Sequence, residues 1–221
     1  MRRLLPDYAD AVELADAYAE PARRRLRDRP WVIVNMIASL DGAIALGERS
    51  GGLSGPADQR VFAHLRDVAD IIVVGAGTAR AERYGPPKRS GLRIGVVTRR
   101  ADLDWRLPLF TSGAGFVITS EDAPAVAVDS VRAGHGEVDL VAVLGQLDGD
   151  VVLCEGGPTL NGDLLAADAI DEWCLTVAPM LAGGDAGRAV ASAREHPVGF
   201  RIAHLLTEDG FLFVRALREG T

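Results

Sequence analysis

Residues 31–42 read WVIVNMIASLDG, and this stretch decides the fold class of the chain. Trp31 to Ser39 are almost all apolar and rich in residues that favour strands, which is typical of a central strand covered on both faces. Asp41 and Gly42 then mark a turn. Because side chains alternate along a strand, we expect Asn35, Ser39 and Asp41 to share one face. The stretch predicts a buried strand with polar groups near its carboxyl end.

Apolar runs of the same kind recur along the chain. Strands are expected at residues 70–74, 92–98, 115–120, 125–129, 151–154 and 172–178. Residues 200–206 and 211–217 flank a D-G turn, which is typical of a hairpin. Helical patterns separate the earlier strands. The sequence therefore predicts an α/β fold of three layers, with a mostly parallel central sheet and an antiparallel C-terminal hairpin.

Helices are expected between these strands. One begins at Pro56, which suits a first helical position, and others follow Gly75 and Pro158. Residues 138–147 fit either a helix or a strand. Gly162 lies inside the last of these helices, where it costs about 1 kcal/mol relative to alanine. That cost indicates close packing against another segment.

The N-terminal region is predicted to be an extension that precedes a single domain. Residues 7–19 have helical spacing, and residues 1–30 are interpreted as a helical extension. A cluster of arginines follows, at positions 23, 24, 25, 27 and 29. The cluster predicts either an anion site or a solvated linker. Because no linker divides the remainder, residues 31–221 are expected to form one domain.

The composition excludes several classes of function. The chain has 221 residues, and its net charge of −7 disfavours nucleic acid and anionic membranes as partners. No stretch has the length and apolarity of a membrane span or the pattern of a signal peptide. The two cysteines and four histidines lack the spacing of a disulfide framework or a metal site. We therefore expect no metal, and a cytoplasmic location.

Two glycine-rich turns follow strands and open helices: residues 75–78 (GAGT) and 155–159 (EGGPT). A helix N-terminus offers free N–H groups and a positive dipole, which suit phosphate groups. Two such turns at one edge of a parallel sheet predict a dinucleotide site. Thr98, Arg99 and Arg100 follow the intervening strand and form either a 2′-phosphate site or an exposed basic turn. The dinucleotide that they imply is NADPH rather than NADH.

Asp41 and Glu155 are the candidate catalytic residues. Each follows an apolar strand beside a glycine, where a carboxylate can orient a polar ring or help to protonate a substrate. The alternative is that each only forms a turn or caps a helix. Asn35 and Ser39 favour the catalytic interpretation of Asp41 and are candidate substrate-binding residues.

Taken in order, these motifs resemble the reductase domain of the bifunctional riboflavin-biosynthesis deaminase-reductase, which shares its fold with dihydrofolate reductase. The matching segments are residues 35–42, 60–70, 74–79, 155–160 and 178–184. The resemblance implies a dihydrofolate-reductase-like fold and an NADPH-dependent reductase. In that family, hydride passes from nicotinamide to the ribosyl carbon of 5-amino-6-(5-phosphoribosylamino)uracil, which is reduced as its imine.

The resemblance also implies roles for individual residues. Asp41 and Glu155 would contact the substrate ring, and Arg60 and Arg83 are candidate ligands of the substrate phosphate. The implied cofactor-binding residues are Ala38, Gly42, Ile44, Gly77, Thr78, Thr98, Arg99, Ser120, Gly156, Gly157, Thr159 and Leu160. Domains of the family pair as homodimers, so a homodimer is expected, with the C-terminal hairpin as a candidate edge.

The chain departs from the family pattern at three points. Family members usually have lysine at the position of Asn35. Residues 81–86 replace a D-x-P-x-L-T-x-R segment that normally helps to hold the substrate phosphate. The zinc deaminase domain of the bifunctional proteins is not expected in this chain. Two alternatives therefore stay open. One is reduction of a pterin such as dihydrofolate, and the other is an NADPH-binding module without turnover.

Overall fold

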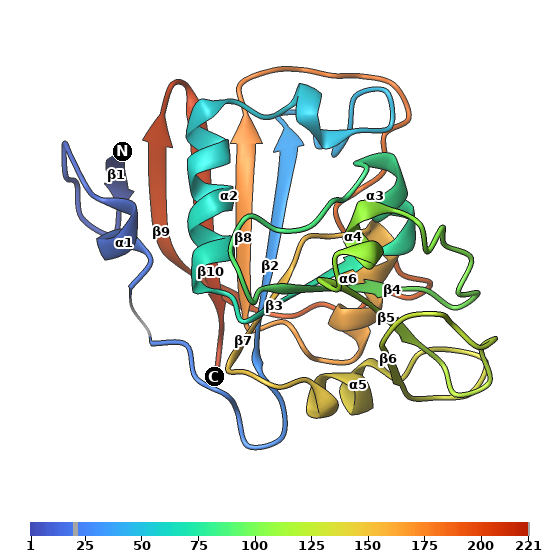
Figure 1. The fold of residues 1–221 in the computed structure, drawn as a ribbon. Helices are drawn as coiled ribbons and strands as arrows, with labels where there is room; N and C mark the ends of the chain where they lie inside the picture. The colour runs from blue at the N-terminus through green and yellow to red at the C-terminus, as the bar shows by residue number, and fades with distance from the viewer. Residues whose placement is uncertain (20–21, 221) are drawn as a thin grey trace.

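The computed structural model describes residues 1–19 and 22–220, and within them ten strands form one sheet (Figure 1). Their order across the sheet is β1-β9-β10-β8-β2-β7-β3-β4-β5-β6. The strands are β1 (Arg2–Leu5), β2 (Trp31–Ser39), β3 (Ile71–Gly75), β4 (Arg93–Val97), β5 (Gly115–Thr119), β6 (Ser130–Arg132), β7 (Val151–Cys154), β8 (Glu172–Ala178), β9 (Phe200–Glu208) and β10 (Phe211–Arg218).

The pairing of the strands confirms the predicted mixed sheet. From β8 through β2 to β6, every neighbouring pair is parallel. Strand β10 runs antiparallel to β8 and to β9, which gives the predicted C-terminal hairpin. Parallel strands need crossover connections, and helices supply these except between β5 and β6, where residues 120–129 contain no helix.

Helices cover both faces of the sheet. They are α1 (Leu14–Ala17), α2 (Pro56–Val68), α3 (Ala76–Ala81), α4 (Pro108–Thr111), α5 (Leu140–Gln146) and α6 (Pro158–Ala166), with the 3-10 turn η1 (Ser50–Gly52). One apolar cluster joins α2 and α4 to one face through Ile33 and Leu153. A second cluster joins α5 and α6 to the other face through Val32 and Val152. The three layers follow from this alternation of buried side chains along the strands.

Most of the predicted elements occur at the expected positions. Helix α2 begins at Pro56, and the ambiguous residues 138–147 contain helix α5. The short strand expected at residues 125–129 is wrong, because β6 lies at Ser130–Arg132 instead. The close packing predicted at Gly162 is confirmed: a Cβ atom added there would lie 2.0 Å from the carbonyl oxygen of Ala191.

The N-terminal region differs most from the prediction. The helix expected over residues 7–19 is wrong for most of its length, because α1 covers only Leu14–Ala17. Strand β1 was not predicted, and it pairs antiparallel with β9. Strand β9 therefore lies between β1 and β10, so the C-terminal hairpin is not a free edge for a dimer. The division of the chain at residue 30 stays a prediction.

The arginine cluster after α1 anchors the N-terminal segment to the sheet. Arg23 donates two hydrogen bonds to Glu172, and Arg29 donates two to Asp171. Arg25 donates to the carbonyl oxygens of residues 145, 147 and 149. For these three arginines, neither the anion site nor the solvated linker is correct, because carboxylates and carbonyl groups of the same chain already bind them.

Among the described residues, no helix is long and apolar enough to cross a membrane.

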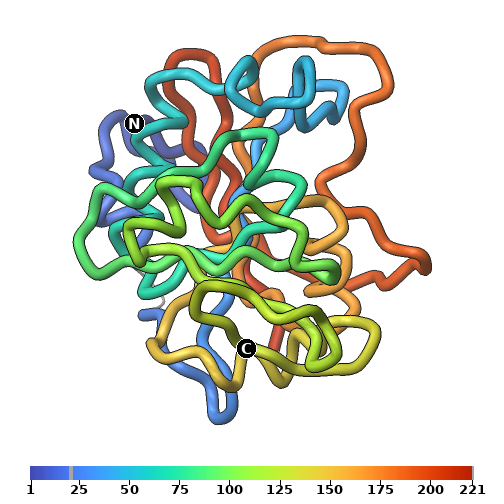
Figure 2. Tube along the Cα trace, turned by 45° about the vertical axis from the view of Figure 1, so that its right-hand side comes forward, coloured from blue at the N-terminus to red at the C-terminus, as the bar shows by residue number. Residues whose placement is uncertain are grey.

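The long connection from β8 to β9 runs from the top of the molecule down its right-hand side in Figure 1, and Figure 2 shows the same course from a second direction.

Candidate active site

A cleft of about 1690 Å³ opens between α2, α3, the end of β4 and the start of α6. It runs along the carboxyl ends of parallel strands, where ligands bind in open α/β sheets. Many of the predicted site residues line it: Asn35, Ile44, Gly77, Thr78, Arg83, Thr98, Arg99, Glu155, Gly157, Thr159 and Leu160.

The two glycine-rich turns touch each other at the base of this cleft. The N–H of Gly75 donates to the carbonyl oxygen of Gly156 at 2.9 Å. Gly156 and Gly157 have φ angles of +89° and +99°, which favour glycine. A Cβ atom on Gly157 would lie 3.3 Å from the Cα of Gly75, whereas one on Gly77 would meet nothing within 4 Å. The turns therefore form a close-packed base with open space above Gly77.

Groups that suit phosphate line one side of the cleft. Thr159 and Leu160 lie in the first turn of α6, where backbone N–H groups lack partners within the helix. Thr98 is buried at the end of β4, and Arg99 and Arg100 after it are exposed. Among the described residues, neither guanidinium makes a hydrogen bond or ion pair that would occupy it. Together with the glycine cradle, this donor set fits a phosphorylated dinucleotide.

Glu155 lies at the centre of a polar cluster in the cleft. Its carboxylate accepts hydrogen bonds from Nε and Nη2 of Arg66, at 2.6 and 2.7 Å. The hydroxyl of Tyr84 donates to the same carboxylate at 2.6 Å. Burial, together with the neighbouring charge of Glu155, raises the pKa of Tyr84 well above its ordinary value. The phenol therefore keeps its proton and remains a hydrogen-bond donor.

Sequence reasoning missed Arg66 and Tyr84. Arg66 lies within the matched segment 60–70, and Tyr84 lies within the segment 81–86 that departs from the family pattern. Where family members usually have lysine, this chain has the neutral Asn35, and the cation that contacts Glu155 comes from α2. The sequence shows Arg66 only as a basic residue in the helix that follows Pro56, which does not distinguish it from a surface charge.

Asn35 offers an unused acceptor to the cleft. Its Oδ1 atom is buried and has no hydrogen-bond partner among the described residues. Buried polar atoms without a partner are uncommon in proteins. An N–H group of a ligand would satisfy this atom, which fits the substrate-binding role predicted for Asn35.

Asp41 and Ser39 lie together, and neither is among the residues that line the cleft. The hydroxyl of Ser39 donates to Oδ1 of Asp41 at 2.5 Å. The N–H groups of Ala182 and Gly183 donate to the same carboxylate at 3.0 and 2.7 Å. These bonds, that of Ser39 first, hold the pKa of Asp41 below its usual range. The structure therefore attaches this carboxylate to residues 182 and 183, whereas the Glu155 carboxylate binds Arg66 and Tyr84.

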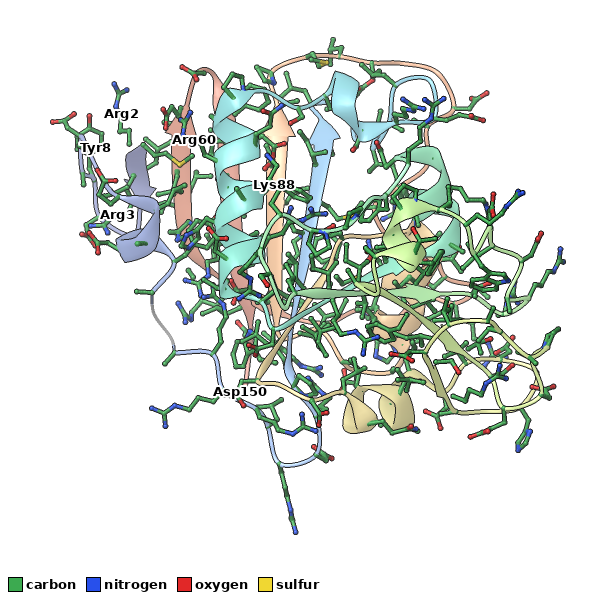
Figure 3. All side chains as sticks on the ribbon, in the orientation of Figure 1. Arg2, Arg3, Tyr8, Arg60, Lys88 and Asp150 are labelled. Atoms are coloured by element: carbon green, nitrogen blue, oxygen red, sulfur yellow. The ribbon has the colours of Figure 1, made fainter. Side chains whose placement is uncertain are left out.

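The remaining predicted residues also lie outside the set that lines the cleft. Arg60 forms an ion pair with Glu208 at 2.5 Å, and it points toward β9 in Figure 3. Lys88, which was not predicted, lines the cleft on the other side of α2 (Figure 3). The others that do not line the cleft are Ala38, Gly42, Ser120 and Gly156, of which Gly156 lies beneath its base and accepts the hydrogen bond from Gly75.

Solved structures share this fold. A pyrimidine reductase-like protein from Corynebacterium diphtheriae superposes with a TM-score of 0.76 at 22% identity, covering 88% of this chain and 94% of its own. Dihydrofolate reductase from Enterococcus faecalis superposes with a TM-score of 0.52 at 13% identity, covering 86% of this chain and 96% of its own. These likenesses confirm the dihydrofolate-reductase-like fold.

Sequence relatives identify the family. The 2,5-diamino-6-ribosylamino-4(3H)-pyrimidinone 5′-phosphate reductase of Methanothermobacter thermautotrophicus is 33% identical over 181 residues, which cover 73% of this chain and 83% of the relative. The reductase of the same name from Archaeoglobus fulgidus is 32% identical over 183 residues, covering 71% and 83%. The RibD C-terminal domain family matches residues 30–208. The chain belongs to the RibD C-terminal domain family, whose relatives are reductases of riboflavin biosynthesis.

Proposed function

We propose that the chain is an NADPH-dependent reductase that reduces the ribosyl group of a pyrimidine 5′-phosphate in riboflavin biosynthesis. One observation carries the proposal: a single cleft joins the glycine cradle of the two turns to the Arg66–Glu155–Tyr84 cluster. A cofactor and a polar ring bound at these two places would lie side by side. Such placement of two reactants is a large part of catalysis.

The residues of the cleft divide into two groups. Gly77, Thr78 and the first turn of α6 would bind the phosphates of NADPH, which supplies the hydride when bound. Thr98 and Arg99 would hold its adenosine end, where the exposed guanidinium of Arg99 supports a 2′-phosphate. In this proposal, specificity for NADPH over NADH rests on Arg99.

The substrate half has two parts. The Glu155 cluster and Asn35 would orient the pyrimidine ring through hydrogen bonds. Arg83 and Lys88 both line the cleft and are the candidate ligands of the substrate phosphate. Lys88 takes the role that sequence reasoning assigned to Arg60, because Arg60 is occupied by Glu208.

The two candidate pyrimidines differ at ring position 2. The relatives are named for a 2,5-diamino pyrimidinone, whereas the sequence analysis expected the uracil form. An amino group donates hydrogen bonds, and a carbonyl group only accepts them. The unpartnered Oδ1 of Asn35 is an acceptor that an N–H donor of either pyrimidine would satisfy, and the 2-amino group gives the diamino compound one more donor for it.

Two further proposals concern the state of the protein. The buried free thiols Cys154 and Cys174 support a reducing compartment such as the cytoplasm. A homodimer would use a surface other than the hairpin edge, because β1 already pairs with β9.

The test measures NADPH oxidation through the change in nicotinamide absorbance. Three substrates are compared in parallel: the diamino pyrimidinone phosphate, its uracil counterpart and dihydrofolate. We expect turnover of a pyrimidine phosphate, fastest with the diamino form. Turnover of dihydrofolate alone would replace the proposal with a pterin reductase. Binding of NADPH without oxidation in any mixture would favour a module without turnover.

A further inference from the structure

The connection between β8 and β9 forms a wall beside the cleft. A second cavity of about 490 Å³ lies between residues 182–187 of this connection and residues 44–48. This cavity shares Ile44, Ala45 and Pro158 with the main cleft. Figures 1 and 2 both show the connection leaving the top of β8 and passing along this side of the molecule. The connection therefore forms one wall of a cavity that adjoins the cleft through these three shared residues.

Asp41 fixes the first part of this connection. Its carboxylate accepts the N–H groups of Ala182 and Gly183, and the hydroxyl of Ser39 orients it from strand β2. Gly183 and Gly184 have φ angles of +64° and +71°, a left-handed backbone conformation that favours glycine. Charge-assisted bonds from a carboxylate to backbone N–H groups are stronger than neutral ones.

Helix α6 fixes the far part of the connection. The buried Asn161 side chain donates to the carbonyl oxygen of Ala189 at 2.7 Å. The N–H of Ala191 donates to the carbonyl oxygen of Pro158 at 2.9 Å. Between these two attachments, residues 184–188 are exposed. The connection is therefore held at both ends, with an exposed span between them.

We propose that Asp41 is a positioning residue, and not a proton donor: it holds residues 182–187 as the wall of the second cavity, which adjoins the cofactor end of the cleft. The assignment of that end to the cofactor rests on the proposed function. Both carboxylate oxygens of Asp41 already accept hydrogen bonds, and Asp41 does not line the cleft. The lowered pKa of Asp41 agrees with a positioning role, because this carboxyl holds no proton to donate near neutral pH.

Asp41→Asn tests the proposal with little change in shape. The amide would present a donor where one oxygen accepts an N–H, so part of the attachment is lost. Arg188 lies in the exposed span, and trypsin cleaves after arginine. The matched control is Asp104→Asn. Asp104 is an exposed carboxylate whose pKa is also lowered, by its bonds to Arg106, and it lies outside the cleft.

The first readout does not depend on activity. We expect trypsin to cut the Arg188–Ala189 bond about tenfold faster in Asp41→Asn than in the wild type, because about one hydrogen bond is lost. Cleavage at Arg100 is the reference within each digest, and Asp104→Asn should behave as wild type. Unchanged cleavage at Arg188 would overturn the proposal, even if the protein oxidises no NADPH.

The second readout separates positioning from proton transfer. We expect Asp41→Asn to raise the KM or the Kd for NADPH several-fold. The shape of the pH profile of kcat should stay the same. A fall in kcat with a changed pH profile and an unchanged KM would instead identify Asp41 as the proton donor.

Discussion

Arg66 and Glu155 form a two-pronged ion pair at the base of the cleft, with Nε–Oε1 and Nη2–Oε2 distances of 2.6 and 2.7 Å. The Glu155 side chain is 2% exposed, whereas that of Arg66 is 26% exposed. The carboxylate is thus nearly removed from water, and the guanidinium still reaches the cleft. The stability of a buried carboxylate depends on its cationic partner, and here the partner Arg66 lines the cleft.

Arg66→Lys keeps the charge but removes the fork that matches both carboxylate oxygens. We expect kcat/KM for the pyrimidine phosphate to fall by about tenfold or more, which corresponds to one charge-assisted hydrogen bond. Steady-state kinetics measure this, and the KM for NADPH should stay near its wild-type value. Arg60→Lys, in the exposed ion pair on the same helix, is the matched control. Equal losses in both variants would contradict a role for the Glu155 cluster.

Tyr84→Phe removes only the hydroxyl that donates to Glu155 at 2.6 Å. We expect a loss of several-fold in kcat/KM for the pyrimidine, because Glu155 loses one of its donors. Since burial and the charge of Glu155 raise the pKa of Tyr84, the phenol does not titrate near neutral pH. The pH profile of the variant should therefore keep the wild-type shape. If the pH profile of the wild type showed a titration that was lost in Tyr84→Phe, the phenol would be identified as a group that transfers a proton.

Arg99→Ala tests the 2′-phosphate site. Arg99 is exposed at the end of β4 and lines the cleft. We expect the Kd for NADPH to rise about tenfold, with little change for NADH, because only NADPH carries the phosphate that this guanidinium would bind. Titration calorimetry with both nucleotides measures the difference. Equal weakening of the two nucleotides would place Arg99 away from the 2′-phosphate.

Local patterns predicted most of the sheet, because buried parallel strands are continuous apolar runs. The stretch 31–39 is strand β2 as expected, and Pro56 begins α2. The glycine turns were also found from the sequence, since positive φ angles and close backbone contacts both require glycine there. These features depend on residues close together in the chain.

The features that were missed depend on distant partners. Strand β1 contains two arginines and becomes a strand only by pairing with β9. Arg23 reaches Glu172 across 149 positions, so no local pattern distinguishes it from a solvated arginine. The same is true of Asp41, whose D-G pattern predicts a turn but not the loop that it binds. Side-chain direction was set by tertiary contacts, and for this reason the candidate site was only partly predicted.

Glu172 makes stability depend on pH. It is buried between Arg23 and Arg215. Burial alone would raise the pKa of its carboxyl, but hydrogen bonds and charges from the two arginines outweigh burial and hold the pKa at about 2. A carboxyl with a lowered pKa stabilises the fold above its unfolded pKa and loses that contribution as pH falls through the folded value. From pH 4.5 to 2, we expect the wild type to lose on the order of 3 kcal/mol through this group.

Glu172→Gln should be less stable than wild type at neutral pH and should lose less stability over that acid window. Urea unfolding at a series of pH values measures both effects. His204 lies in the same cluster, and burial together with the charge of Arg215 lowers its pKa to about 4. Protonation of His204 therefore weakens the fold as pH falls from about 6.5 to 4. Adding His204→Asn to the wild type and to Glu172→Gln removes this contribution from both proteins. If the free energies of unfolding of the wild type and of Glu172→Gln fell in parallel below pH 4, the acid loss of stability would not come from Glu172.

Gly162→Ala tests the packing of α6 against the β8–β9 connection. At an exposed helix position, alanine in place of glycine stabilises by about 1 kcal/mol. At Gly162 the added Cβ would lie 2.0 Å from the oxygen and 2.7 Å from the carbon of the Ala191 carbonyl group, and backbone atoms cannot turn aside. We therefore expect Gly162→Ala to be destabilised by roughly 1–3 kcal/mol. Gly77→Ala is the control for stability, because its Cβ meets nothing within 4 Å and helix α3 should gain from it. Denaturant unfolding should give opposite signs for the two variants, and the same sign in both would mean that Ala191 does not pack on Gly162.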